Sequence, residues 1–255
     1  MLLTIDIGNT LIDFGLWDND ELSFVYKTRT KPLRSLDEYR SVLELFVMTK
    51  HLEEAKIDRA IISSVVPPLS PIFKTIVSSL FGVKAKILGP RLKSGLAIKT
   101  DNPQEVGADL VADAVGAISK YGSNLFIADL GTANKFIYIN ENSAFGGCAI
   151  APGLAIGANS LSKDTAALPE VNLLAPDHVI GKNTHDSMNS GIIFSNVYAI
   201  EGFANAFEKE VGRPLKRILT GGNSIYVKKN LPGFEYEENL LLLGLKEIDK
   251  RNNKK

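Results

Sequence analysis

The feature that most constrains this chain is a motif that occurs twice: an aspartate, a glycine two residues later and then a threonine, directly after an apolar segment. The first copy begins at Asp6 and the second at Asp129. In both copies strand-like sequence resumes after the threonine, so each motif is predicted to form a turn between two strands. Because the copies lie far apart, at matching positions of two halves, the sequence indicates a duplicated domain.

A turn of this composition suits a bound phosphate group. Glycine lets the backbone approach a ligand closely, backbone amides and the threonine hydroxyl can bond phosphate oxygens, and the aspartate can orient Mg²⁺ or its waters. One aspartate–glycine turn is ordinary turn chemistry. Two at matched positions indicate a duplicated domain that holds a nucleotide.

Strands and helices are predicted to follow the order strand–strand–strand–helix–strand–helix, twice, which indicates an α/β fold with two similar mixed sheets flanked by helices. The predicted strands cover residues 2–7, 11–17, 21–28, 60–65, 85–88, 124–129, 134–140, 144–151 and 217–220. The predicted helices cover about 36–51, 70–81, 104–120, 184–211 and 238–249, followed by a frayed tail at 251–255. We expect a boundary near Tyr121, with domains of residues 1–121 and 122–255. Both motifs fall at the carboxyl ends of strands, where sheets of this kind bind ligands.

The composition excludes several classes of protein. With 255 residues, 45% of them hydrophobic, the chain can bury one large core or two smaller ones. Lys+Arg and Asp+Glu are both 29, so no net charge favours nucleic acid or an anionic membrane. No apolar stretch approaches the ~20 residues of a membrane span, and no signal peptide is visible, so we expect a cytoplasmic protein. The single cysteine, Cys148, excludes an internal disulfide and is expected to be buried.

Two further segments have alternative interpretations. The paired glycines Gly221 and Gly222 follow a predicted strand, where they could let a base or ribose lie against the backbone or could simply form a turn. Asp109 lies at the start of a predicted helix, where it could act in catalysis or only interact with the helix dipole. No phosphate-binding loop of the GxxxxGK[ST] type and no Ser–His–Asp signature is visible.

A set of segments spread over nearly the whole chain carries a resemblance to a known family. These segments are Asp6–Thr10, Ile62–Pro67, Asn102–Asp109, Asp129–Ala133, Ala151–Gly153, Thr165–Pro169, Gly181–Thr184, Ser190–Gly191 and Thr220–Gly222. In this order and spacing they resemble the bacterial type III pantothenate kinases, of the acetate and sugar kinase, heat-shock protein and actin superfamily. The resemblance implies two ribonuclease-H-like domains around a nucleotide cleft. It also implies ATP-dependent phosphorylation of the primary hydroxyl of pantothenate, the first step of coenzyme A biosynthesis.

The resemblance also implies roles for individual residues. ATP would be bound by Asp6, Ile7, Gly8, Asn9, Thr10, Leu11, Ile12, Asp13 and Thr132. Asp6 would also act on Mg²⁺, and Asp129 would bind an activating monovalent cation, K⁺ or NH₄⁺. Pantothenate would be bound by Gly107, Ala108, Asp109 and Leu110, with Asp109 as the base that accepts the hydroxyl proton. Thr184 would reach pantothenate from the neighbouring subunit, which implies a homodimer.

The chain departs from the family pattern at the positions that recognise the acid. Leu110 occupies the position at which the family has an arginine that binds the pantothenate carboxylate. Thr100 replaces a tyrosine, and Asn134 and Lys135 replace two threonines. Losing a bidentate arginine removes roughly 1.5–3 kcal/mol, unless Lys135 or another cation compensates. The alternatives are therefore a kinase for another small hydroxylated acceptor, or a nucleotide-binding relative with little catalysis. The retained Asp109 favours an enzyme.

Overall fold

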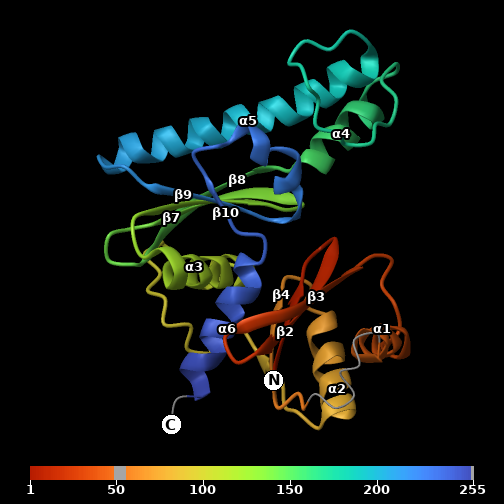
Figure 1. Ribbon diagram of the computed structural model, residues 1–255, viewed down its shortest axis with the longest axis vertical. Helices are drawn as coiled ribbons and strands as arrows, with labels where there is room; N and C mark the ends of the chain where they lie inside the picture. Colours follow the sequence, from red (N-terminus) through yellow and green to blue (C-terminus); the bar gives the residue numbers. More distant parts are fainter. Residues whose placement is uncertain (49–55, 254–255) are drawn as a thin grey trace. The chain divides into compact units, whose positions relative to one another are not determined.

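The computed structural model describes residues 1–48 and 56–253, which form two compact units (Figure 1). The first unit contains Met1–Leu96, Asn102–Ser119 and Leu241–Lys255, and the second contains Ala97–Asp101 and Lys120–Leu240. The chain passes from the first unit to the second between Ser119 and Lys120, next to the predicted boundary at Tyr121. Residues 97–101 belong to the second unit although they precede this point, and residues 241–255 belong to the first unit although they follow it. Each unit has its own sheet and its own core.

The first unit is built on a five-stranded mixed sheet in the order β3-β2-β1-β4-β5. Its strands are β1 (Leu2–Ile7), β2 (Leu11–Asp18), β3 (Glu21–Arg29), β4 (Arg59–Ser64) and β5 (Lys86–Ile87). Its helices are α1 (Leu36–Met48), α2 (Leu69–Phe81), the short 3₁₀ helix η2 (Pro103–Glu105), α3 (Ala108–Tyr121) and α6 (Leu240–Asn253). β1 to β3 are antiparallel, while β4 pairs with β1 and β5 pairs with β4 in parallel.

The second unit repeats this arrangement, because its sheet has the order β10-β9-β6-β7-β8. Its strands are β6 (Leu125–Leu130), β7 (Ala133–Ile139), β8 (Phe145–Pro152), β9 (Lys216–Thr220) and β10 (Glu235–Tyr236). Its helices are α4 (Leu154–Asp164), α5 (Thr184–Val211) and the 3₁₀ helices η3 (Gly222–Tyr226) and η4 (Lys228–Asn230). β6 corresponds to β1, with antiparallel β7 on one side and parallel β9 on the other. The predicted α/β class with two similar mixed sheets is confirmed.

The central strand of each sheet is buried because its residues are almost all apolar. In β1 every residue except Asp6 is buried, and in β6 all six residues are buried. The first core stacks Phe14 on Phe46, with ring centroids 6.0 Å apart. The second stacks Phe136 of β7 on Phe203 of α5 at 4.5 Å, so α5 covers one face of its sheet. Both turn motifs therefore extend from rigid strands.

Several predicted boundaries need correction. The helix expected from residue 104 begins as η2, and α3 starts only at Ala108. The helix expected to end at residue 51 is described to Met48, and the remaining predicted positions lie outside the described residues. Cys148 is exposed, because β8 turns alternate residues outward and this position faces that way.

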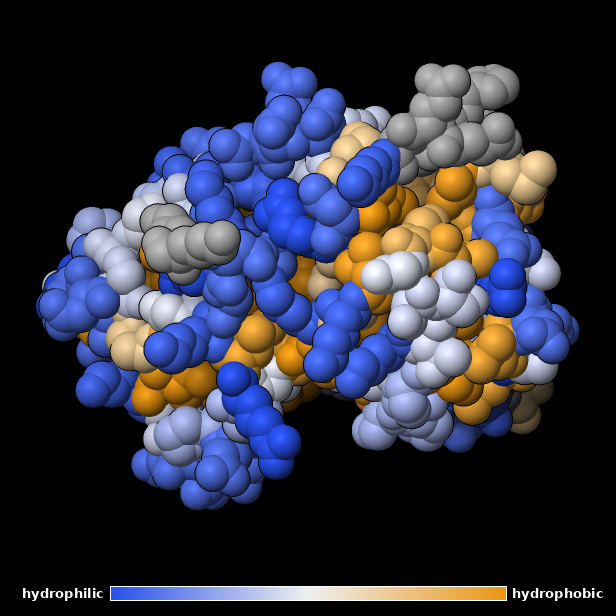
Figure 2. Space-filling view, turned by 90° about the horizontal axis from the view of Figure 1, so that it is seen from below, coloured by the Kyte–Doolittle hydropathy of each residue, from blue (hydrophilic) through white to orange (hydrophobic). Residues whose placement is uncertain are grey.

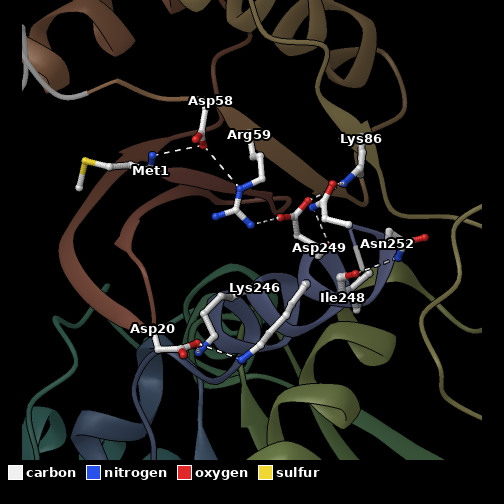
Figure 3. Close-up of polar contacts among 11 residues, drawn as sticks. Met1, Asp20, Asp58, Arg59, Lys86, Lys246, Ile248, Asp249 and Asn252 are labelled. Carbon is white, nitrogen blue, oxygen red and sulfur yellow. Dashed lines mark hydrogen bonds and ion pairs between the residues drawn. The ribbon is translucent and has the colours of Figure 1, made fainter. Parts of the chain in front are cut away.

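The predicted frayed tail is helical as far as Asn253, because α6 is anchored within the first unit. The Arg251 guanidinium donates to the Ser94 carbonyl at 2.7 Å. The buried Asp249 carboxylate accepts from Arg59 at 2.9 Å and from Lys86 at 2.7 Å, and Lys246 donates to Asp20 at 3.0 Å (Figure 3). These charged contacts join the last helix of the chain to β4, to β5 and to the turn between β2 and β3.

The surface is mixed in character. Figure 2 shows one face on which hydrophilic and hydrophobic residues lie interspersed. Within residues 1–48 and 56–253, no helix combines the length and the apolar character needed to cross a membrane.

Candidate active site

The first motif forms an exposed turn between β1 and β2 that is held from within its own sheet. The Gly8 amide donates to the Leu11 carbonyl at 2.9 Å. Thr30, directly after β3, donates its hydroxyl to the Gly8 carbonyl at 2.7 Å and its amide to the Thr10 carbonyl at 2.9 Å. Asn9 and Thr10 are exposed at the tip. An ordered backbone with an exposed amide and hydroxyl is the arrangement that a phosphate group requires.

Two carboxylates lie at the base of this turn. Asp6 on β1 and Asp13 on β2 are directly opposite one another in the antiparallel register, so their side chains lie on the same face of the sheet. The Lys27 ammonium lies 3.4 Å from the Asp13 carboxylate. Mg²⁺ in phosphate sites is usually held by one or two carboxylates together with waters and the phosphates. The donor set of Asp6 and Asp13 fits that ion. Ile7 and Ile12 are buried in the core, so only their backbone can serve a nucleotide.

The second motif forms a shorter turn between β6 and β7 that is held by other segments of its unit. A Cβ on Gly153, at the start of α4, would lie 2.3 Å from the Thr132 carbonyl oxygen, so the residue must be glycine for the backbones to pass this closely. The Asn223 amide donates to the Gly131 carbonyl at 2.8 Å. Thr132 itself is exposed. Sequence reasoning did not assign Gly153 or Asn223 to the site; the available signal was that Gly153 directly follows β8 and that Asn223 lies three residues after β9.

Asp129 is buried at the end of β6, with 7% of its surface exposed. Its Oδ2 lies 2.5 Å from the Lys135 Nζ. On its other side a Cβ at Gly221, which has a φ of +88°, would lie 2.4 Å from Asp129 Oδ1. The carboxylate is therefore enclosed by a backbone segment and an ammonium group. The donor set already holds one monovalent positive charge and does not fit a K⁺ or NH₄⁺ ion in addition.

The predicted substrate segment lies at the start of α3. Asp109 Oδ1 accepts a hydrogen bond from the Leu110 amide at 2.9 Å, and a Cβ on Gly107 would lie 2.4 Å from that oxygen. Gly107 therefore leaves room for the Asp109 carboxylate to fold back over the helix start. Asp109 and Ala108 are half-buried, whereas Leu110 is only 7% exposed. The Asp109 carboxylate is therefore accessible to a substrate hydroxyl, as a general base must be. The Leu110 side chain beside it is apolar and buried.

Two further predicted positions lie in the second unit. Thr184 is the exposed first residue of α5, and Asn183 caps this helix by accepting from the Asp186 amide at 2.9 Å. The Thr100 hydroxyl oxygen is buried and has no hydrogen-bond partner among the described residues. The structure thus brings Asp6, the first turn and Asp109 into one unit, and Thr132, Asp129 and Thr184 into the other.

Comparison with known proteins decides the family. A family model described as type III pantothenate kinase matches residues 2–206. A type III pantothenate kinase from a Geobacillus strain is 38% identical over 253 residues, which cover 99% of this chain and 98% of the relative. That of Geobacter sulfurreducens is 36% identical over 253 residues, 99% of each chain. This chain belongs to the type III pantothenate kinase family. It is therefore a kinase and uses ATP, as the resemblance implied.

Solved structures support the fold. A protein from Campylobacter jejuni described as a conserved Baf family transcriptional activator has a TM-score of 0.63 at 21% identity, over 98% of each chain. A protein from Sinorhizobium meliloti described as a 2-dehydro-3-deoxygalactonokinase also has a TM-score of 0.63, at 10% identity, over 98% of this chain and 96% of its own. At these identities the similarity concerns the fold of two ribonuclease-H-like domains.

Proposed function

We propose that this type III pantothenate kinase transfers the γ-phosphoryl group of ATP to the primary hydroxyl of pantothenate, the first step of coenzyme A biosynthesis. The observation that carries the proposal is the family match along the whole chain, combined with a half-buried Asp109 at a helix start. Phosphoryl transfer depends on positioning and charge neutralisation more than on covalent chemistry. The site residues described above can supply both the positioning of the reactants and the neutralisation of phosphate charge. A cytoplasmic location is part of this proposal.

In the first unit, the turn of Gly8, Asn9, Thr10 and Leu11 binds phosphate oxygens through the Thr10 hydroxyl and through backbone amides other than that of Gly8, which donates to the Leu11 carbonyl. Asp6 and Asp13 would hold Mg²⁺, which would neutralise charge on the phosphates. The Thr30 bonds to Gly8 and Thr10 support this role, because they keep the turn in one conformation before the nucleotide arrives.

Asp109 acts as the general base toward the acceptor hydroxyl. Its Oδ1 is held by the Leu110 amide at 2.9 Å, which orients the carboxylate at the start of α3. A carboxylate in this position removes the hydroxyl proton as the phosphoryl group is transferred. Gly107 and Ala108 line the approach to it.

In the second unit, Thr132 binds ATP phosphate, and Thr184 binds pantothenate of the neighbouring subunit in a homodimer. The proposed dimer is supported by large apolar side chains that are exposed on this unit. Ile180 is 81% exposed, Leu174 66% and Tyr198 of α5 57%. An interface in the homodimer would remove these side chains from water.

One observation favours a second acceptor. Leu110 offers no charge to a carboxylate and is nearly buried, while the Thr100 hydroxyl is buried without a partner among the described residues. A small hydroxylated acceptor that lacks the carboxylate of pantothenate would suit the apolar Leu110 better.

The test is an ADP-release assay with Mg²⁺–ATP and pantothenate, followed by a panel of hydroxylated compounds with and without a carboxylate. Turnover of pantothenate supports the proposal. Faster turnover of a compound without a carboxylate would instead make that compound the proposed acceptor. Asp109→Asn should lower turnover at least ~100-fold, the usual scale of removing a general base. Asp37→Asn is the matched control, because Asp37 also lies in the first turn of a helix of the same unit, α1, and is exposed. Equal turnover of the two variants would make Asp109 structural.

A further inference from the structure

We propose that the Lys135 ammonium takes the place of the activating monovalent cation, so that this kinase works without K⁺ or NH₄⁺. The inference rests on the proposed function, because it concerns the same phosphoryl transfer. It differs from the expectation for Asp129, which was assigned to an external monovalent cation.

The first observation is the register of the two strands. Asp129 of β6 pairs with Lys135 of β7 in the antiparallel sheet, so both side chains lie on the same face. β7 lies between β6 and β8, with Lys135 opposite Ile150, so its backbone is held on both sides. The ammonium reaches Asp129 from a fixed position and not from a loose loop.

The second observation is the contact itself. Lys135 Nζ lies 2.5 Å from Asp129 Oδ2, and the two side chains are only 18% and 9% exposed. Gly221 lies close to the other carboxylate oxygen, where even a Cβ would come within 2.4 Å. Both oxygens of Asp129 therefore have close protein neighbours, and one of these neighbours already carries the charge.

The third argument is chemical. A lysine ammonium carries the same single positive charge as K⁺ and the same kind of N–H donors as NH₄⁺. A second monovalent cation on Asp129 would lie within a few ångströms of that ammonium and would be repelled, and the repulsion is strong where water is largely excluded. The matched position in the first unit differs, because there a second carboxylate, Asp13, lies opposite Asp6, and the Lys27 ammonium lies 3.4 Å from Asp13.

The experiment compares turnover in KCl, NH₄Cl, NaCl and choline chloride at equal ionic strength, with Mg²⁺–ATP and pantothenate. The wild type should show the same rate in all four salts. Lys135→Ala should lose about 100-fold in choline chloride, the scale of removing one preorganised charge or donor, and should recover when K⁺ or NH₄⁺ is added. Lys135→Arg should stay independent of the salt. Lys216→Ala is the matched control, because Lys216 is a partly exposed lysine of the same sheet.

A binding measurement separates this inference from the proposed function. Thallium(I), which replaces K⁺, should bind to Lys135→Ala and not to the wild type, as followed by thallium NMR without any substrate. If pantothenate is not turned over, the proposed function fails and the thallium result still decides the role of Lys135. Saturable activation of the wild type by K⁺, or a Lys135→Ala variant that no cation rescues and that binds no thallium, would overturn the inference.

Discussion

The two halves of this kinase place different charges at the same point of the same scaffold. In the first sheet Asp6 lies between Asp13 and Ser63 on its neighbouring strands, and in the second sheet Asp129 lies between Lys135 and Thr220. The strand order and the pairing directions match. The residue opposite the aspartate therefore decides whether that aspartate faces a second carboxylate, which itself lies near Lys27, or an ammonium group.

The halves also differ in how each turn is held. The first turn is bonded by Thr30, directly after the third strand of its own sheet. The second is held by Gly153 and Asn223, which come from segments after β8 and β9. The composition of a turn thus indicates what it can bind, while its rigidity depends on neighbours that lie elsewhere in the chain.

The largest expected effect tests the two carboxylates of the first half. Asp6→Asn and Asp13→Asn should each lower turnover about 100-fold and raise the Mg²⁺ concentration needed for half-maximal rate, because an electrostatic group at the phosphates is lost. Turnover measured against Mg²⁺ at saturating ATP checks this. Asp18→Asn, on the exposed end of β2, should change neither quantity. An Asp13→Asn enzyme with an unchanged Mg²⁺ requirement would remove the contrast with Lys135.

A smaller effect is expected from crowding the second turn. Gly153→Ala places a Cβ 2.3 Å from a backbone oxygen, so the backbone must move, and overpacking of this kind costs about 1–3 kcal/mol of stability. Gly157→Ala in α4 meets no atom within 4 Å and should stabilise the helix by about 0.5–1 kcal/mol.

Gly8→Ala extends this test to the first turn. Its Cβ would lie 3.0 Å from the Leu11 carbonyl oxygen, which a small shift can relieve, so it should cost less than Gly153→Ala. Urea unfolding of the three variants gives the order. A Gly153→Ala protein as stable as the wild type would show that the second turn is not held by this close approach.

The smallest effect concerns an ion pair of the second unit. Two hydrogen bonds from the Arg217 guanidinium keep the pKa of the Glu208 carboxyl below its ordinary value of 4.5. A lowered pKa in the folded state contributes stability above the ordinary pKa, and this is lost as the pH falls through the lowered one. Glu208→Gln should therefore cost roughly 0.5–1 kcal/mol near neutral pH and nothing in strong acid. Thermal unfolding across pH measures it, and a cost that does not change with pH would contradict the charge argument.

Much of the fold follows from local patterns. The alternation of apolar runs predicted the strands, and the helical spacing of residues such as Ile192, Ile193 and Ile200 predicted α5, because the buried face of an element repeats at a known period. Cys148 shows the limit. It lies in a run of glycine and apolar residues with no polar partner to mark the outer face, so the pattern did not tell which side it faces.

The Lys135–Asp129 pair was predictable from the sequence only in part. With the turn at Gly131–Ala133, the two residues are the second pair of the hairpin, so the register was contained in the sequence. The sequence did not show that the ammonium meets a carboxylate enclosed by Gly221. That depends on β9, which reaches the site from far along the chain.

The amino-acid sequence by itself determined the duplicated sheets, the two aspartate–glycine turns and the family, because each can be recognised from short segments of the chain without knowing how they pack. Only the tertiary structure decided that α6, the last helix, belongs to the first unit, where Asp249 meets Arg59 and Lys86. It also decided which segments hold the second turn and what surrounds Asp129. The physical reason is that a buried charge or a close backbone approach needs a specific partner, and that partner can come from any part of the chain.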